Sequence, residues 1–184
     1  MLLLLGYHRI VFFEALMNPP APPPPAGVPL EFGFLERDAL DEIAAFRSDL
    51  QRAELEERFN REERCFVARC EGEIVCAYWV HTHNVRLAEA GYELVVPDDA
   101  VYVGDSFTAP GMRGRRIAPA LSRELKNRLA AEGVERWASY VLGGNDIGLI
   151  NARRGGSSET SRVAAIKLGP LPAVRVPYVP RKRS

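Results

Sequence analysis

The chain has 184 residues, of which 47% are hydrophobic and 26% are charged, and its 24 basic residues balance 24 acidic ones. This length is typical of one domain with a buried core. The zero net charge excludes bulk attraction to nucleic acid, and no segment approaches the roughly 20 apolar residues that cross a bilayer. We therefore expect a soluble globular protein with no membrane or nucleic-acid partner.

The three cysteines, Cys65, Cys70 and Cys76, lack the CxxC spacing of a zinc or redox site. The apolar run from Met1 to Leu5 is broken before it reaches the length of a secretory signal segment. Both features favour a reducing cytoplasmic location.

The first 27 residues differ in composition from the remainder. A short apolar arm, IVFFEALM, is followed by the proline-rich segment NPPAPPPPAGVP. Proline fixes φ and lacks an N–H group, so this segment predicts an extended linker that the core does not need. We expect the arm to be either an added edge strand or unstructured, and we divide the chain into residues 1–27, arm and linker, and residues 28–184, the main domain.

Hydrophobic spacing and turn residues predict the elements that follow the linker. The first half has, in order, a strand at 29–35, a helix at 37–50 with Asp38 as N-cap, a helix at 53–59, a hairpin at 65–80 turning at Glu71-Gly72, a loop at 81–100 and a strand at 101–108. The second half has a helix with Ile117, Leu121, Leu125 and Leu129 on one face that ends at Gly133, a strand at 135–142, a short helix at 145–156, and strands at 161–168 and 174–179. This alternation implies a mixed sheet with helices on both faces.

The segment APGMRGRRIAPAL places arginines and a glycine at the start of a helix. The first turn of a helix leaves N–H groups without partners, and the aligned peptide dipoles add partial positive charge there. The segment therefore predicts an anion site.

The order of elements, with VYVGDSFTAPGMRGRRIAPAL at its centre, resembles the GNAT superfamily of acyl-CoA-dependent N-acyltransferases. The resemblance extends from about Pro29 to the last strand. It implies an α/β (α+β) fold with a mixed, mostly antiparallel sheet of six or seven strands, helices on both faces and a splay at the central strand. It also implies acetyl-CoA as the acyl donor. We expect no metal, for the reason given below for His81 and His83.

The resemblance assigns cofactor contacts to two segments. The loop Arg113, Gly114, Arg115, Arg116, Ile117 and Ala118 would cradle the pyrophosphate through its backbone N–H groups. Free backbone groups of Phe107 and Thr108 on the splayed strand would bind pantetheine and polarise the thioester. Arg116 stands where the family usually has its central glycine, and it would be strained if that position needs a positive φ.

A second match is NDIGLINARRGG, which resembles the family's Asn-x-x-Ser/Ala helix. Asn145 takes the asparagine position and joins the expected cofactor contacts, Gly148 takes the small-residue position, and Gly156 takes the final glycine. Ser157 replaces the usual Phe. Ala152 replaces the tyrosine that protonates the departing thiolate in many members, so an active enzyme would need another acid or water.

A third feature is the hairpin FVARCEGEIVCAYWV, which resembles that of family members in which a long substrate-side loop follows. The first two helices and the loop at 81–100 would then form the amine site. The acidic residues of this loop either favour a cationic amine or are simply solvated, and they are Glu89, Glu93, Asp98 and Asp99.

Asp105 is the carboxylate nearest the splay and is our candidate base for the amine proton. Its alternative roles are to cap a bulge beside Gly104 or to pair with an arginine. Tyr78 and His81 are further candidates that also suit packed or rim positions. His81 and His83 would share one face of a continued strand, but a zinc site needs a third ligand that the sequence does not supply.

Three functions remain open. The first is an N-acyltransferase acting on a small-molecule or peptide amine. The second is a degenerate member that binds acyl-CoA as a sensor or partner without turnover, a role favoured by Arg116, Ala152 and Ser157. The third is an arginine-mediated nucleic-acid-binding module, which zero net charge and the lack of a binding motif disfavour. The sequence leaves open whether the chain forms a homodimer.

Overall fold

The computed structural model describes residues 5–17, 20–87, 92–168 and 174–177. Its strands are β1 Leu5–Leu16, β2 Glu31–Phe34, β3 Arg64–Cys70, β4 Glu73–His81, β5 Val85–Leu87, β6 Tyr92–Leu94, β7 Ala100–Thr108, β8 Arg136–Leu142, β9 Ser158–Leu168 and β10 Val174–Pro177. Its helices are α1 Leu40–Phe46, α2 Arg52–Asn60, α3 Ile117–Ala131 and α4 Asp146–Arg154, with short 3-10 turns η1 Arg37–Ala39 and η2 Pro110–Met112.

The main sheet has eight strands in the order β10-β9-β1-β8-β7-β4-β3-β2, and β5 and β6 form a separate pair. Neighbouring strands of the main sheet are antiparallel, except that β7 and β8 are parallel. The predicted fold class, a mixed and mostly antiparallel sheet with helices on both faces, is confirmed. The expected count of six or seven strands had not included β1.

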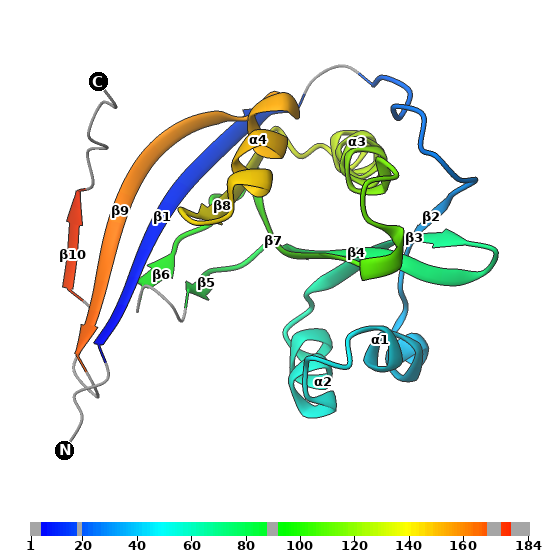
Figure 1. Ribbon diagram of the computed structural model, residues 1–184, viewed down its shortest axis with the longest axis horizontal. Coiled ribbons are helices and arrows are strands. Elements are labelled where there is room, and N and C mark those ends of the chain that lie inside the picture. Colours follow the sequence, from blue (N-terminus) through cyan, green and yellow to red (C-terminus); the bar gives the residue numbers. More distant parts are fainter. Residues whose placement is uncertain (1–4, 18–19, 88–91, 169–173, 178–184) are drawn as a thin grey trace.

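Helices cover both faces of the sheet, with α3 and α4 on one side of β3, β4 and β7 and α1 and α2 on the other (Figure 1). Under α3, the residues Ile117, Leu121, Leu125 and Leu129 pack with Phe66, Val80 and Val103. On the opposite face, Ile43 of α1 and Leu55 of α2 pack with Val67 and Trp79. The alternation of β4, with Val80 on one side and Trp79 on the other, thus builds two cores from one strand.

Most predicted elements are present close to their expected bounds. The helix expected at 37–50 is shorter, because η1 occupies Arg37–Ala39 and α1 then begins at Leu40. The expected N-cap Asp38 therefore lies within η1, and Ala39 is the N-cap of α1 without a side-chain hydrogen bond. The loop expected at 81–100 contains the strands β5 and β6.

The N-terminal arm is an interior strand, which corrects both sequence-based alternatives. β1 lies between β8 and β9 and pairs antiparallel with each of them. Its side chains enter the core, since Ile10 and Phe13 are each 1% exposed. The composition of residues 10–17 showed that the arm was apolar, but a strand this distant in sequence from its partners leaves no local signal of its place. The division of the chain at residue 27 stays a prediction about domains.

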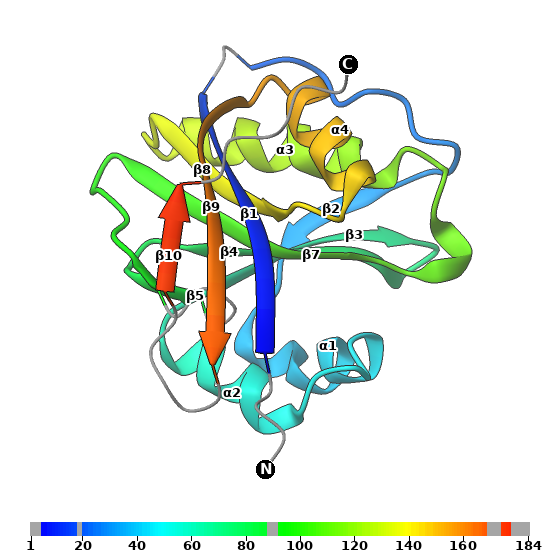
Figure 2. The ribbon, with the colours of Figure 1, turned by 60° about the vertical axis from the view of Figure 1, so that its left-hand side comes forward.

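The proline-rich linker crosses α3 on its way from β1 to β2 (Figure 2). The side chain of Asn127 on α3 holds both backbone groups of Ala21, since Nδ2 donates to the carbonyl at 2.8 Å and Oδ1 accepts from the N–H at 3.3 Å. Further along, the N–H of Gly27 donates to the carbonyl of Arg115 at 2.9 Å. The linker is therefore fastened to the helix and to the loop before it.

Because β1 is an interior strand, truncating one of its buried side chains should destabilise the fold strongly. We expect Phe13→Ala to lower the free energy of unfolding by about 3–5 kcal/mol, because loss of the Phe13 ring leaves a cavity between packed strands. Leu16→Ala is the matched control, since Leu16 lies on the same strand and is 70% exposed. Denaturant unfolding followed by circular dichroism measures both. Equal effects of the two substitutions would contradict the interior position of β1.

Candidate functional site

The centre of the candidate site is the gap between β7 and β8. These parallel strands pair only from Ala100 to Tyr102 on β7 and from Arg136 to Ala138 on β8. Beyond these residues β8 keeps its antiparallel pairing with β1, and β7 keeps its pairing with β4. The strands therefore diverge toward their carboxyl ends, and the splay that the sequence predicted is confirmed.

Strand alternation determines which backbone groups of β7 face the splay. The N–H of Ala109 donates to the carbonyl of Val75 at 3.0 Å, so Ala109 faces β4. Phe107, two residues earlier and opposite Ala77, directs its backbone groups to β4 as well. Ser106 and Thr108 therefore direct theirs into the splay. Of the two residues expected to offer backbone groups there, Thr108 faces the splay, with its carbonyl accepting from Arg113 Nε, and Phe107 faces β4. The cofactor contacts of both residues stay a prediction.

The loop between β7 and α3 forms a concentrated set of hydrogen-bond donors. The consecutive backbone N–H groups from Gly114 to Ala118 donate no hydrogen bond within the described part of the chain. Pro119 follows them and has no N–H group. The side chains of Arg113, Arg115 and Arg116 are exposed around these donors. A run of free donors at a helix N-terminus with cations around it fits a phosphate or pyrophosphate.

Arg116 is the N-cap of α3 and has φ 61° and ψ 21°, the left-handed conformation. Gly114, two residues earlier, has φ 79°. The sequence indicated that Arg116 would be strained if its position needed a positive φ, and the structure shows that it does. An arginine in this conformation costs roughly 1–2 kcal/mol that a glycine avoids.

Three contacts fix the position of this loop. Arg113 donates from Nε to the carbonyl of Thr108 at 3.2 Å, which folds the loop back on the end of β7. Tyr78 of β4 donates from its hydroxyl to the carbonyl of Ala118 at 3.3 Å, and burial raises the pKa of this tyrosine. Gly27 binds the carbonyl of Arg115 from the linker side. The donors are thus held in place by β4, β7 and the linker.

The helix α4 begins at the carboxyl end of β8, across the splay from Thr108. Asn145 is its N-cap, and the side-chain Oδ1 accepts from the N–H of Gly148 at 2.9 Å. A Cβ atom on Gly148 would lie 2.7 Å from Asn145 Nδ2 and 2.9 Å from Val141 Cγ1, so this position needs glycine. At the other end of α4, Lys126 of α3 donates to the carbonyl of Gly155 at 2.9 Å. Burial, and then the charge of Arg123, lowers the pKa of Lys126.

Asp105 lies in a bulge of β7, where the register with β4 shifts between Ala77 and Trp79 and where its φ is 44°. Its Oδ2 accepts from Arg47 Nη1 at 3.0 Å and from Arg58 Nη1 at 2.5 Å. Two alternatives left open by the sequence, a bulge position and pairing with arginine, are therefore both present. Asp105 connects the splayed strand to α2 and to the residue that follows α1.

The two arginines are held by more than Asp105. Arg47 has a side chain only 4% exposed and also binds Asp49, with Nε to Oδ1 at 2.8 Å. Burial alone would lower the pKa of Arg47, but the hydrogen bonds to Asp49 and Asp105 outweigh burial and the net effect raises it. Arg47 lies over the ring of Phe107 at 4.9 Å, and Arg58 lies over Trp79 at 5.0 Å. Sequence spacing gave no sign of these contacts, since Arg47 and Arg58 are remote from Asp105 in the chain.

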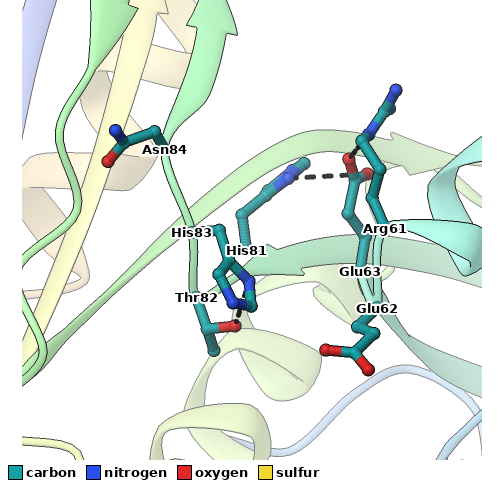
Figure 3. Close-up of a pocket in the computed structure, with 7 residues that line it drawn as sticks. All are labelled: Arg61, Glu62, Glu63, His81, Thr82, His83 and Asn84. Carbon is teal, nitrogen blue, oxygen red and sulfur yellow. Dashed lines mark hydrogen bonds and ion pairs between the residues drawn. The ribbon is translucent and has the colours of Figure 1, made fainter.

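The two histidines at the end of β4, His81 and His83, do not converge. The imidazole of His81 faces Glu63, whereas Nδ1 of His83 lies 3.1 Å from Thr82 Oγ1 (Figure 3). These residues, with Arg61, Glu62 and Asn84, line a small cavity of about 40 Å³. Across the described ranges, no group of three or more His, Cys, Asp and Glu side chains is arranged to hold a metal ion.

The acidic loop residues are engaged in part. Asp99 binds Arg136 at the start of β8, and Glu93 accepts from Asn84 Nδ2 at 3.3 Å. Glu89 lies outside the described residues. Cys65, Cys70 and Cys76 are free thiols, two of them buried. Among the helices that the structure describes, none has the length and apolar character needed to cross a membrane.

Comparisons with known proteins agree with this geometry. The acetyltransferase (GNAT) family profile matches residues 33–148. A GCN5-related N-acetyltransferase from Sphaerobacter thermophilus is similar with a TM-score of 0.63 and 19% identity, over 89% of this chain and 53% of that one. An acetyltransferase of the GNAT family from Colwellia psychrerythraea has a TM-score of 0.62 and 13% identity, over 89% and 57%.

A Drosophila protein is also similar, with a TM-score of 0.63 and 11% identity over 90% of this chain and 52% of that one. At such identities these likenesses show the fold alone. The chain spans about half the length of these solved structures. A search among curated proteins gives no match.

The contacts of Asp105 predict a structural role that can be measured. We expect Asp105→Asn to lower the free energy of unfolding by about 1–3 kcal/mol, because Arg47 and Arg58 lose their shared anion while asparagine still tolerates the positive φ. Asp41→Asn is the control, since Asp41 pairs with Arg52 but is 83% exposed, and should change stability by less than about 0.5 kcal/mol. If urea unfolding shows that Asp105→Asn lowers the free energy of unfolding no more than the control does, the structural role of Asp105 is contradicted.

The conformation of Arg116 predicts that its replacement by glycine stabilises the fold. We expect Arg116→Gly to raise the free energy of unfolding by about 0.5–1 kcal/mol, after subtraction of the backbone entropy of glycine. Arg115→Gly is the matched control, because Arg115 is equally exposed and is not among the residues with positive φ. Calorimetric melting temperatures that move in the same direction for both variants would contradict the assignment.

Proposed function

Because this chain belongs to the GNAT acetyltransferase family, we propose that it transfers an acetyl group from acetyl-CoA to the amine of a small molecule or peptide. The observation that carries the proposal is the splay of β7 from β8, which opens beside the free donors of Gly114 to Ala118. A thioester cofactor with a pyrophosphate suits both parts. Its thioester supplies an activated acyl group.

The loop from Gly114 to Ala118, which we call the donor loop, would hold the phosphates. Backbone N–H groups from Gly114 to Ala118 donate no hydrogen bond to the residues that the structure describes, and they lie at the α3 N-terminus, which carries partial positive charge. Exposed side chains of Arg115 and Arg116 would add charge-assisted hydrogen bonds. Arg113 keeps its Nη groups for the same purpose while its Nε binds Thr108.

The splay would hold the extended part of the cofactor. The backbone groups of Ser106 and the N–H of Thr108 lie along this strand edge, while the Thr108 carbonyl already accepts from Arg113. An amide-containing chain laid against β7 would extend the ladder. The same edge supplies an N–H donor for a carbonyl oxygen that gains negative charge during acyl transfer. Asn145 would contribute from the β8 side by fixing the start of α4, since its Oδ1 already binds Gly148.

The amine would approach from the face covered by α1 and α2, where Asp105 lies. Asp105 is the base that the sequence predicts. Its Oδ2 is shared by Arg47 and Arg58, and this pairing favours a role in fixing the bulge. Attack by the amine breaks an N–H bond and the C–S bond, so one proton must leave the nitrogen and one must reach the sulfur.

A second candidate function is an acyl-CoA-binding protein without turnover. It is favoured by Ala152, which places a methyl group on α4 where many relatives carry a tyrosine acid. Calorimetric titration with acetyl-CoA, followed by a thiol-release assay over a library of amines and peptides, separates the candidates. Binding with thiol release supports the transferase, and binding alone supports the sensor. The lack of binding would refute both.

The donor loop predicts that one added carboxylate weakens cofactor binding. We expect Gly114→Asp to raise the Kd for CoA at least about tenfold, or about 1.4 kcal/mol, because a carboxylate would stand among the phosphate donors. Gly72→Asp is the matched control, since Gly72 has φ 85° against 79° for Gly114 and both positions have open space for a side chain. If the folded Gly114 variant bound CoA as well as the control does, the loop would not be the phosphate site.

The position of Ala152 predicts a gain of activity. We expect Ala152→Tyr to raise turnover, because a phenol on α4 would supply the acid that thiolate departure lacks, and one general acid contributes about 10²- to 10⁴-fold. Ala152→Phe is the control, since it adds the same ring without the hydroxyl. Thiol-release rates at saturating acetyl-CoA measure the effect. Equal rates for the tyrosine and phenylalanine variants would contradict the placement of this helix beside the sulfur.

A further inference from the structure

The side chains of His81 and Glu63 face each other at the end of β4 (Figure 3). His81 lies two residues after Trp79 on this strand, and therefore on the α1 and α2 face of the sheet. His81 is the last residue of β4, and Glu63 directly precedes β3. Their side chains are 12% and 10% exposed, with Nδ1 of His81 3.5 Å from Oε2 of Glu63. Oε2 is buried and has no hydrogen-bond partner, so it is positioned to receive an N–H from the imidazole.

The charges around this pair favour an ionised carboxylate. Oε1 of Glu63 accepts from Arg61 Nε at 2.8 Å. Burial alone would raise the pKa of Glu63, but the neighbouring imidazole of His81 and the hydrogen bond from Arg61 outweigh burial and the net effect lowers it. Glu62 and His83 line the same cavity, and Tyr102 of β7 faces the imidazole from the neighbouring strand. An imidazolium at this place would therefore be stabilised by a carboxylate that is already charged.

The pair is connected to the splay through Tyr102. His81 and Tyr102 are register partners on β4 and β7, and their ring centroids are 5.3 Å apart. The hydroxyl of Tyr102 leans over Gly104, where a Cβ atom would lie only 2.7 Å from it. Gly104 lies just past the last residue of β7 that pairs with β8, at the root of the splay. Tyr102 thus contacts the His81 ring and also approaches Gly104 at the root of the splay.

We propose that His81, oriented by Glu63, accepts the proton that the amine loses during acyl transfer. In this step the amine nitrogen forms a bond to the thioester carbonyl carbon, and its N–H proton passes to Nε2 of His81, directly or through one water. The C–S bond breaks, and the thiolate takes a proton from solvent. The products are the amide, the free thiol and an imidazolium paired with Glu63, which returns its proton to water in the adjoining cavity.

Glu63 is a positioning residue in this scheme. In the scheme its Oε2, 3.5 Å from Nδ1, receives a hydrogen bond from the Nδ1–H group, which leaves Nε2 as the basic nitrogen of the neutral ring. Nε2 has no hydrogen bond to any side chain in the described ranges. The role falls to His81 because the carboxylate of Asp105 is bound by two arginines.

The first test uses activity and rests on the proposed function, so it begins with the amine that gives the fastest thiol release. We expect His81→Gln to lower kcat by about 10²- to 10⁴-fold and to abolish the acid limb of the pH profile, with CoA affinity kept. Glu63→Gln should give a smaller loss and move that limb to lower pH, because the imidazolium loses its counter-charge. His83→Asn is the control and should match the unaltered protein.

The second test needs no substrate. Nitrogen chemical shifts of the His81 imidazole in the free protein report which nitrogen carries the proton, and we expect the Nδ1–H form. The Nε2–H form would overturn the inference, as would thiol release by His81→Gln at the unaltered rate. Absence of any transfer by the unaltered protein, with CoA still bound, would instead refute the proposed function itself, and the base assignment would fall with it.

Discussion

The structure depends on the incomplete pairing of β7 with β8. Unpaired backbone groups in a sheet are costly unless something binds them. Here they open between β8, which pairs with β1 on its other side, and β7, which pairs with β4 except at the bulge. The bulge at Asp105 makes the divergence possible, because it turns the β7 backbone by placing a non-glycine residue at φ 44°. Arg47 and Arg58 then hold that bulge from the opposite layer.

The strand β8, which borders the splay opposite β7, is held by the N-terminal strand β1. β8 pairs with β7 over a short stretch only, whereas β1 pairs with the opposite edge of β8 from Ile10 to Leu16. The linker that follows β1 crosses α3 and binds the carbonyl of Arg115. The described residues of this N-terminal segment therefore support both the splayed strand β8 and the loop that carries the free donors.

The sequence predicted what depends on local patterns. The hydrophobic face of α3, the turn at Glu71-Gly72 and the donor loop at Gly114 each follow from residues that are close in the chain. Contacts between residues distant in the chain were not predicted. β1 has a strand pattern but no local indication of its neighbouring strands. Arg47 and Arg58 bind Asp105 only because tertiary packing brings these segments together. His81 was named as a secondary candidate, but its partner Glu63 was invisible because it precedes a different strand.

The two proton transfers of acyl transfer fall on opposite faces of the sheet in the scheme that we propose. The amine would lose its proton on the α1 and α2 face, where the Glu63 carboxylate lies beside the His81 imidazole. The sulfur would gain its proton on the α4 face, where the methyl side chain of Ala152 has no proton to donate. A well-oriented base makes the attack easier, but it does not help the thiolate leave. If both assignments hold, breakdown of the tetrahedral intermediate limits this chain more than its formation does, and its rate then depends on how readily water reaches the sulfur beside α4.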